Sequence, residues 1–233
     1  MGRLMRAIIC SVDCGDFLAQ TLPAWKRLLP EGSLGVATSP LDTETQFVCT
    51  QNQVPMWITD AWFRADPACH HGANPPTFNM ALGLDEVFGF RPGLRDAPAD
   101  GELCLSLNAD VYPFGKLPSE KDIPKGTMAG WWRYECATGA DLVAHLREKR
   151  PIAAYKRMKN SGGRPVGYAQ LFRYFPGFKF GSYGSAAKYD VHVFERFQRL
   201  EMRSELYLFH LGGPEGGHQN WIKRCVPRWT VAA

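Results

Sequence analysis

The sequence predicts an α/β protein with a mostly parallel central sheet flanked by helices, and three observations support this. In the first 107 residues, short apolar runs alternate with segments that have helical spacing of apolar residues. Strands that alternate with helices are typical of parallel sheets with right-handed crossovers. Polar or acidic residues follow each of the first four predicted strands, and no apolar run approaches the roughly 18 residues of a membrane span.

The first half of the chain contains the most regular elements. The run RAIICSV at 6–12 is apolar and β-branched, which favours a buried strand. Asp16 is expected to cap the helix that follows, and Pro23 is expected to break that helix locally. Further strands are expected at 34–38, 54–59 and 103–107, and helices at 17–29, 42–52 and 78–88.

The second half is less regular. We expect an amphipathic helix at 186–203, because Tyr189, Val193 and Phe197 would share an apolar side. Strands are expected at 128–134, 166–174 and 205–209. Because no linker interrupts the chain, we expect a single domain over 1–233. Its nucleotide-binding half would cover about 1–115 and its acceptor half about 116–233.

Composition favours a soluble globular protein. Hydrophobic residues make up 45% of the chain, which is enough for a substantial core. The seven cysteines are scattered and include no C-x-x-C pair, so a disulfide framework is not expected. The first residues lack the apolar region of a signal peptide, because Asp13 and Asp16 follow too soon. We therefore expect a cytoplasmic protein that does not enter a membrane.

Polar residues gather where the first four predicted strands end. Ligands of α/β proteins bind outside the carboxyl ends of the strands. Asp and Asn also favour ordinary turns, which would explain any one of these residues alone. Four such ends at one edge favour a binding site. The residues are Asp13, Thr38 with Asp42, Asp60, and Asn108 with Asp110.

The Asn-x-Asp pair that ends the 103–107 strand suggests a cation site. Mg²⁺ and Mn²⁺ prefer oxygen ligands and keep waters and substrate phosphates in their coordination shell. One or two protein ligands are therefore enough. The carboxylate of Asp110 suits this role, whereas the neutral Asn108 is better suited to a ribose hydroxyl or a water.

Eight segments, taken in order, resemble the GT-A class of nucleotide-sugar glycosyltransferases, especially the small enzymes of phages and bacteria. The resemblance spans nearly the whole chain. The segments are GDFLAQTLPAW, VATSPLDTETQFVC, WITDAWF, PTFNMALGLDEVF, LCLSLNADVYPFG, RPVGYAQLFRY, AAKYDVHVFERF and LFHLGGPEGGHQNWIKR.

The resemblance implies a GT-A (Rossmann-like) fold and a set of site residues. Mn²⁺ or Mg²⁺ would be held by Asp110 and His210, with His218 as the alternative to His210, and would contact the diphosphate of a UDP-sugar. Asp190 would be the general base, with His192 and Glu195 as alternatives. The implied donor-binding residues are Ser11, Asp13, Thr38, Asp42, Asp60, Asn79, Asn108, Asn220 and Trp221.

The chain departs from the pattern of that class at three positions. Asn108 stands where the class has the first Asp of D-x-D, which weakens a two-carboxylate metal site. Met80 stands where Lys is usual, and Lys223 stands where Gly is usual. These departures affect donor affinity and metal dependence and leave Asp110, His210 and Asp190 in place.

A basic stretch in the second half suggests an acidic acceptor. Between residues 147 and 164 there are seven Lys or Arg and one Glu, next to a segment dense in aromatics. Such a stretch is commonly a solvated face, but it also suits DNA phosphates, and aromatic rings can stack on bases. A duplex base would have to be flipped out to present its hydroxyl. The implied acceptor-binding residues are Lys156, Arg157, Lys159, Arg164 and Trp131.

The function expected from this resemblance is an inverting, metal-dependent transfer of a sugar from a UDP-sugar to a hydroxyl. By analogy with phage enzymes, the favoured acceptor is a hydroxymethylpyrimidine in DNA, which would place a phage-encoded protein in the host cytoplasm. The same chemistry on a surface saccharide or small molecule is an alternative. A nucleotidyltransferase, or a DNA-binding module with an inactive nucleotide site, would be a different class of protein.

Overall fold

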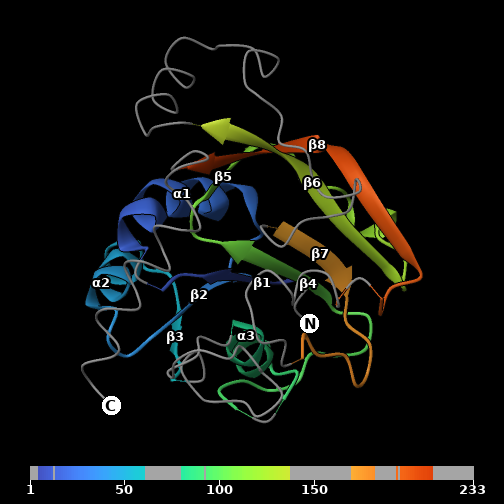
Figure 1. The fold of residues 1–233 in the computed structure, drawn as a ribbon, viewed down its shortest axis with the longest axis horizontal. Coiled ribbons are helices and arrows are strands. Elements are labelled where there is room, and N and C mark those ends of the chain that lie inside the picture. Colours follow the sequence, from blue (N-terminus) through green and yellow to red (C-terminus); the bar gives the residue numbers. More distant parts are fainter. Residues whose placement is uncertain are drawn as a thin grey trace, which may run out of the picture.

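The computed structural model describes residues 5–12, 14–60, 80–91, 93–136, 169–181, 193 and 195–211. Its first four strands lie side by side and parallel, as the sequence predicted (Figure 1). The order is β3-β2-β1-β4, and β1 pairs in parallel with both β2 and β4. The strands are β1 (Met5–Cys10), β2 (Leu34–Thr38), β3 (Met56–Ile58) and β4 (Leu103–Asn108).

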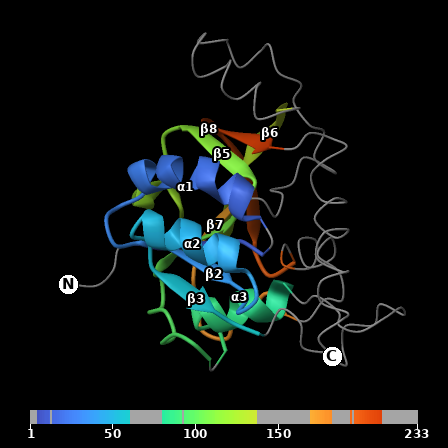
Figure 2. The same cartoon turned by 90° about the vertical axis from the view of Figure 1, so that its left-hand side faces the viewer.

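Within the described residues, three helices lie between these strands along the chain and cover both faces of the sheet. α1 (Gly15–Leu28) and α2 (Thr43–Gln51) pack on one face, and α3 (Met80–Phe88) packs on the other (Figures 1 and 2). Side chains alternate across a strand, so β1 serves both layers. Ile9 joins the α1 and α2 core, and Ile8 joins the α3 core.

The second half of the sheet is mixed rather than parallel. The strands β5 (Val111–Gly115), β6 (Thr127–Cys136), β7 (Ala169–Arg173) and β8 (Arg199–Leu211) extend the order as β4-β7-β6-β8-β5. β7 is antiparallel to β4 and to β6, β6 and β8 are parallel, and β5 is antiparallel to β8. The prediction of a mostly parallel sheet therefore holds for the first four strands and fails around β7 and β5.

The predicted helix at 186–203 is wrong from residue 195 on, whereas Val193, the one described residue before that, is helical. Residues 199–203 belong to the long strand β8, residues 195–196 form a turn, and 197–198 lead from it into the strand. Val193 and Phe197 are buried as expected, but they pack in the α3 core from a segment that leads into a strand. The expected strand at 205–209 is the later part of β8.

Two local expectations also fail in the first half of the chain. Cys14, rather than Asp16, is the N-cap of α1, and Asp16 lies in the first turn, where its charge suits the helix dipole. Pro23 sits inside α1 without ending it. The carbonyl that Pro23 leaves without a helical donor belongs to Ala19, which is exposed, so water can satisfy it.

The strand β5 was not expected, because Pro113 lacks a backbone N–H to donate to a sheet. The structure places β5 at an edge of the sheet, where β8 is its one partner among the described strands. An edge strand has one side without sheet partners, so a proline is tolerated there. The sheet curls so that the start of β5 lies against α1, where the Trp25 indole donates to the Val111 carbonyl at 2.8 Å (Figure 1).

Candidate functional site

The carboxyl ends of β1, β2, β3 and β4 meet at one edge of the sheet, as predicted. Cys10 is in register with Ala37 and Asn108, and Thr38 is in register with Ile58. The residues that follow each strand therefore lie along one line. Open α/β sheets bind ligands at this edge.

Three of the predicted donor-binding side chains lie at this edge, buried and bonded to neighbours. The hydroxyls of Ser11 and Thr45 share a hydrogen bond of 2.9 Å. Thr38 Oγ1 donates to Asp42 Oδ2 at 3.3 Å, and the Thr45 N–H donates to Asp42 Oδ1 at 3.0 Å. Asp42 is thereby the N-cap of α2. This network joins β1, β2 and α2 just below the edge, and it gives Ser11, Thr38 and Asp42 a structural role.

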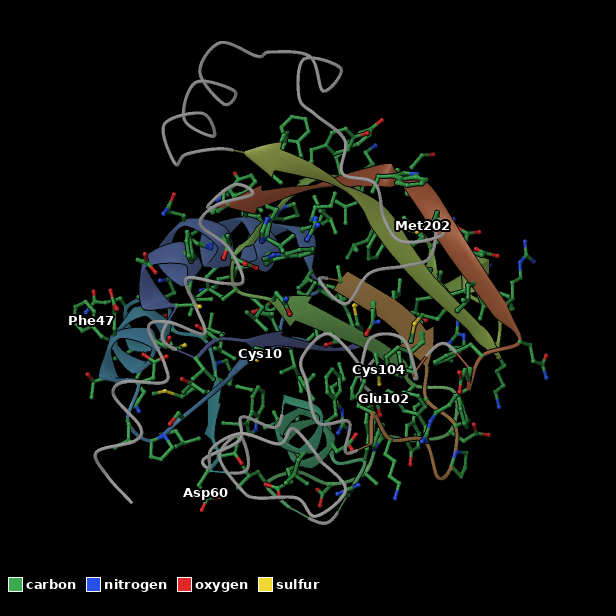
Figure 3. All side chains as sticks on the ribbon, viewed as in Figure 1. Cys10, Phe47, Asp60, Glu102, Cys104 and Met202 are labelled. Atoms are coloured by element: carbon green, nitrogen blue, oxygen red, sulfur yellow. The ribbon has the colours of Figure 1, made fainter. Side chains whose placement is uncertain are left out.

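Two further predicted donor-binding residues differ in exposure. Asp60 follows β3 and is exposed, and Figure 3 shows it at the lower left, away from Cys10 at the end of β1. Asn108 ends β4, in register with Cys10, and is half-buried. Asn108 thus lies near the centre of the edge and Asp60 lies toward its outer end.

The turn formed by Ala109 and Asp110 is fixed by hydrogen bonds to the backbone of both residues. The Ala109 N–H donates to the Cys10 carbonyl at 3.1 Å, and the Thr21 hydroxyl donates to the Ala109 carbonyl at 2.7 Å. The Asp110 carbonyl accepts from the Leu211 N–H at 2.8 Å. Backbone groups fixed in this way from β1, α1 and β8 hold the Asp110 carboxylate on a rigid support, which precise ligand binding requires.

The structure brings together the two residues predicted as metal ligands. His210 lies on β8 in register with Val111, and its Nε2 is 3.1 Å from Asp110 Oδ2. The side chains are 5% and 18% exposed, which makes this a shielded pair with one partly open carboxylate. The other carboxylate oxygen, Asp110 Oδ1, is buried and has no hydrogen-bond partner within the described part of the chain.

The Asp110–His210 pair suits a divalent cation. Adjacent ligands of an octahedral ion at 2.0–2.1 Å lie about 2.9 Å apart. In the structure the two atoms are hydrogen-bonded directly at 3.1 Å, a separation that is also close to that value. Oxygen and imidazole ligands suit Mn²⁺, and the unpaired Oδ1 is a further acceptor. The described residues contain no group of three or more metal-ligating side chains, so waters or substrate phosphates would complete the shell.

The other predicted site residues lie outside the described residues. They are Asp13, Asn79, Asn220 and Trp221 for the donor, Asp190 for the base, and Lys156, Arg157, Lys159 and Arg164 for the acceptor. His218 and His192 also lie outside, whereas Glu195 is exposed in the turn at 195–196.

Trp131 differs from its predicted role as an acceptor-binding residue. The structure places Trp131 on β6 with its side chain fully buried in the core that packs against α1. A ring with no exposed face cannot stack on a base in this arrangement. We therefore attribute the aromatic residues near Trp131 in the sequence to packing of the core rather than to stacking on bases.

Two buried polar residues near the sheet were missed from the sequence. Gln170 lies on β7, fully buried, and its position inside the apolar run AQLF was the available signal. Asp85 lies on α3, and its carboxylate accepts from the N–H groups of Phe180 and Gly181 at 2.6 and 3.1 Å. Burial raises the pKa of Asp85 to about 7, against the lowering effect of those N–H groups and of Arg91.

Comparison with known proteins does not name a family. The sequence matches no protein-family model and no curated protein. Among solved structures, a mycobacterial protein is similar with a TM-score of 0.44 and 13% identity, over 91% of this chain and 66% of that chain. The galactosyltransferase LgtC, solved with donor and acceptor sugar analogues, is similar with a TM-score of 0.38 and 11% identity, over 97% and 94%.

In the first of these comparisons the chain spans a little under two thirds of its neighbour's length. Neither similarity is close enough to assign a function. Within the described residues, no helix is long and apolar enough to cross a membrane.

Proposed function

We propose that the protein is a metal-dependent glycosyltransferase of the GT-A type that moves a sugar from a UDP-sugar to a hydroxyl acceptor. The observation that carries the proposal is the contact between Asp110 and His210. The two residues lie 100 positions apart, yet their side chains meet at 3.1 Å at the edge where α/β sheets bind ligands.

In this proposal the described residues bind and orient the donor. Asp110 and His210 would hold Mn²⁺ or Mg²⁺, which would neutralise negative charge on the leaving diphosphate. The half-buried Asn108, two residues before Asp110, would hydrogen-bond the donor's ribose. The network of Ser11, Thr38 and Asp42 fixes the neighbouring strand ends so that these groups keep their positions.

The experiment is a titration of UDP in the presence of Mn²⁺ against the wild type, Asp110→Asn and His210→Gln. Both variants should weaken Mn²⁺-dependent UDP binding at least as much as the loss of an outer-shell partner, which is about 10–100-fold. Asp110→Asn keeps the shape of the side chain, so its melting temperature should stay close to that of the wild type. Asp100→Asn is the control, because Asp100 is an exposed acid paired with Lys125.

Equal UDP affinity with Mn²⁺ and with EDTA would contradict the metal role of Asp110. Release of pyrophosphate from UTP and a sugar phosphate would instead indicate a nucleotidyltransferase, the alternative from another class. UDP binding without any release of sugar from UDP-glucose or UDP-galactose, with or without acceptor, would indicate an inactive nucleotide site.

We propose DNA as the acceptor, with Asp190 as the base and an inverting outcome. The support for DNA is the basic stretch at 147–164, which holds seven Lys or Arg against one Glu. The burial of Trp131 removes one predicted base-stacking residue, so this part of the proposal depends on the charges of the stretch. A surface saccharide carries no row of phosphates and so needs no cluster of positive charges. The salt dependence of binding therefore distinguishes the two acceptors.

A further inference from the structure

One buried hydroxyl of α1 is hydrogen-bonded to the turn that contains Asp110. Thr21 is fully buried in the middle of α1, and its hydroxyl donates to the Ala109 carbonyl at 2.7 Å, across 88 positions of sequence. A threonine in a helix can instead donate to the carbonyl four residues earlier, as Thr50 of α2 does to Gln46 at 2.9 Å. The Thr21 hydroxyl therefore links α1 to the end of β4.

The carbonyl that accepts from Thr21 belongs to the peptide group before Asp110. Because a peptide group is planar, its orientation determines the φ angle of the residue that follows. The carbonyl of the next peptide group, between Asp110 and Val111, accepts from the Leu211 N–H at 2.8 Å. Thr21 and Leu211 therefore fix the peptide groups on either side of Asp110, and with them the direction in which its side chain leaves the backbone.

A second donor on α1 keeps the helix beside this turn. Trp25 lies about one helical turn after Thr21, and its indole N–H donates to the Val111 carbonyl at 2.8 Å. Figures 1 and 2 both show α1 beside β5. Trp25 is fully buried, so α1 should stay in place when only the hydroxyl of Thr21 is removed. The effect of that hydroxyl is therefore local to the peptide group between Ala109 and Asp110.

We propose that Thr21 is a positioning residue for the cation, because its hydroxyl keeps Asp110 in the orientation that lets the carboxylate share a metal ion with His210. The inference rests on the proposed function, since it requires a cation at this pair. Asp110 Oδ2 lies 3.1 Å from His210 Nε2. Metal ligands have to keep their positions to within about 0.5 Å, and a change in the φ angle of Asp110 would move the carboxylate.

The test compares Thr21→Val and Thr21→Ser with the wild type in titrations of UDP, with Mn²⁺ and with EDTA. Val keeps the branched shape of Thr and removes the hydroxyl, whereas Ser keeps the hydroxyl. In Thr21→Val, the affinity for UDP with Mn²⁺ should fall by about tenfold or more, as when a metal ligand loses its outer-shell partner. Its affinity for UDP in EDTA should stay at the wild-type value. Thr21→Ser should bind UDP with Mn²⁺ as the wild type does.

The concentration of Mn²⁺ distinguishes weaker cation binding from a loss of contacts to UDP. The titrations are made near the Mn²⁺ concentration that half-saturates the wild type. If Thr21→Val has lost cation affinity, a proportionate increase in Mn²⁺ should restore its affinity for UDP by mass action. A loss of direct contacts to UDP would remain at any Mn²⁺ concentration.

Ser33→Ala is the matched control, because it also removes a hydroxyl that donates to a backbone carbonyl. Ser33 is buried, precedes β2 at the opposite end from the site, and donates to the Pro30 carbonyl at 2.6 Å. Both variants should have lower melting temperatures than the wild type, since each leaves a carbonyl without its donor. Ser33→Ala should keep the wild-type affinity for UDP with Mn²⁺. An equal loss in both variants would show that general destabilisation is responsible and would overturn the inference.

Three further results would overturn the inference. Equal affinities of Thr21→Val and the wild type for UDP with Mn²⁺ would show that Asp110 keeps its orientation without the hydroxyl. An equal loss with Mn²⁺ and with EDTA, or a loss that excess Mn²⁺ does not reverse, would show that Thr21 supports the fold rather than the cation site. In these cases weaker binding by Asp110→Asn would still support the proposed function. A wild type whose affinity for UDP is the same with Mn²⁺ and with EDTA would overturn both.

Discussion

At the scale of single residues, the buried polar groups of this protein differ in how fully they are hydrogen-bonded within the described residues. The carboxylate of Asp85 on α3 is hydrogen-bonded through both oxygens, because the N–H groups of Phe180 and Gly181 donate to it. Asp110 keeps one oxygen unpaired within the described residues, and Gln170 keeps its whole amide unpaired. Asp85 therefore anchors the chain at Phe180 and Gly181, whereas Asp110 lies at the proposed donor site.

The burial of Asp85 predicts a pH dependence of stability. Its pKa rises from 3.8 to about 7 on folding, chiefly because burial disfavours the charged form. Between these values the folded state holds the proton more tightly than the unfolded state does. The free energy of unfolding should therefore fall as pH rises from about 4 to about 7, by at most about 4 kcal/mol from this group.

Thermal unfolding of the wild type and Asp85→Asn across that range measures the effect, since the variant has no proton to lose at this position. The stability difference between wild type and variant should decrease toward pH 7 and stay level above it. A difference that does not change with pH would show that Asp85 is not the group responsible.

Asp190 is the second prediction at this scale. As general base it would take the proton from the acceptor hydroxyl, so Asp190→Asn should lower turnover by about 10²–10⁴-fold. UDP-glucose affinity should stay at the wild-type value, because the base faces the acceptor. Single-turnover kinetics and calorimetry measure the two quantities. Affinity that falls in parallel with the rate would indicate a structural role for Asp190.

At the scale of elements, the sequence predicted helices and strands well where it showed either helical spacing or strand alternation of apolar residues. It was misleading where both patterns were present in one segment. The strands and helices up to β4 follow apolar runs and helical spacing, and their boundaries lie within a few residues of those expected. At 186–203, the spacing of Val193 and Phe197 suggested a helix, although both pack on the α3 core ahead of a strand. The alternation of Glu201, Arg203 and Glu205 with Leu200 and Met202 was the strand signal.

That alternation has a physical basis in the ion pairs of β8. Arg203 contacts Glu201 at 3.1 Å and also pairs with Glu205, so charges two apart meet on one face of the strand. Contacts of this kind require a period of two and are not available to a helix, where neighbours are three and four apart. The mixed sheet could not be predicted for a related reason, because strand order depends on pairing between distant segments.

Substitution of Gly35 tests how closely β2 and β3 pack. A Cβ at Gly35 would lie 1.4 Å from Trp57 Cζ3, so the Trp57 ring occupies the space of the missing side chain. Gly35→Ala should lower the free energy of unfolding by about 1–3 kcal/mol through overpacking. The melting temperature should fall by about 2–4 °C for each kcal/mol.

The double variant Gly35→Ala, Trp57→Leu is the control, since the smaller side chain makes room for the added methyl group. Its stability should exceed the value expected from adding the two single effects. Strict additivity would show that Gly35 and Trp57 do not compete for the same space. Trp57 also lies under Arg95, with the guanidinium carbon 4.2 Å from the ring centroid, so this contact should weaken in Gly35→Ala.

At the scale of the whole molecule, the charge distribution leads to a prediction about the acceptor. If the basic stretch contacts DNA phosphates, changing Lys156, Arg157 and Lys159 to Ala should weaken DNA binding at every sequence. The logarithmic salt slope should flatten by about 0.9 for each DNA phosphate that the variant no longer neutralises. Titration of a duplex at several salt concentrations measures this slope, and sugar release from the donor without DNA should not change.

A second triple variant separates local contacts from net charge. Lys116, Lys121 and Lys125 are exposed, and changing all three to Ala removes the same charge elsewhere. This variant should keep most of the salt slope. Equal slopes in the two variants would show that only the net charge of the protein matters. A wild type that does not bind DNA at low salt would favour a saccharide or small-molecule acceptor.

The contact between Asp110 and His210 also determines when the site can exist. The two residues are separated by 100 positions, and they meet only after β5 has paired with β8. Closing so long a loop is entropically costly and slow compared with forming local contacts. A chain still emerging from the ribosome would lack His210 until 100 residues after Asp110 had been added, so the proposed cation site could not guide the early steps of folding.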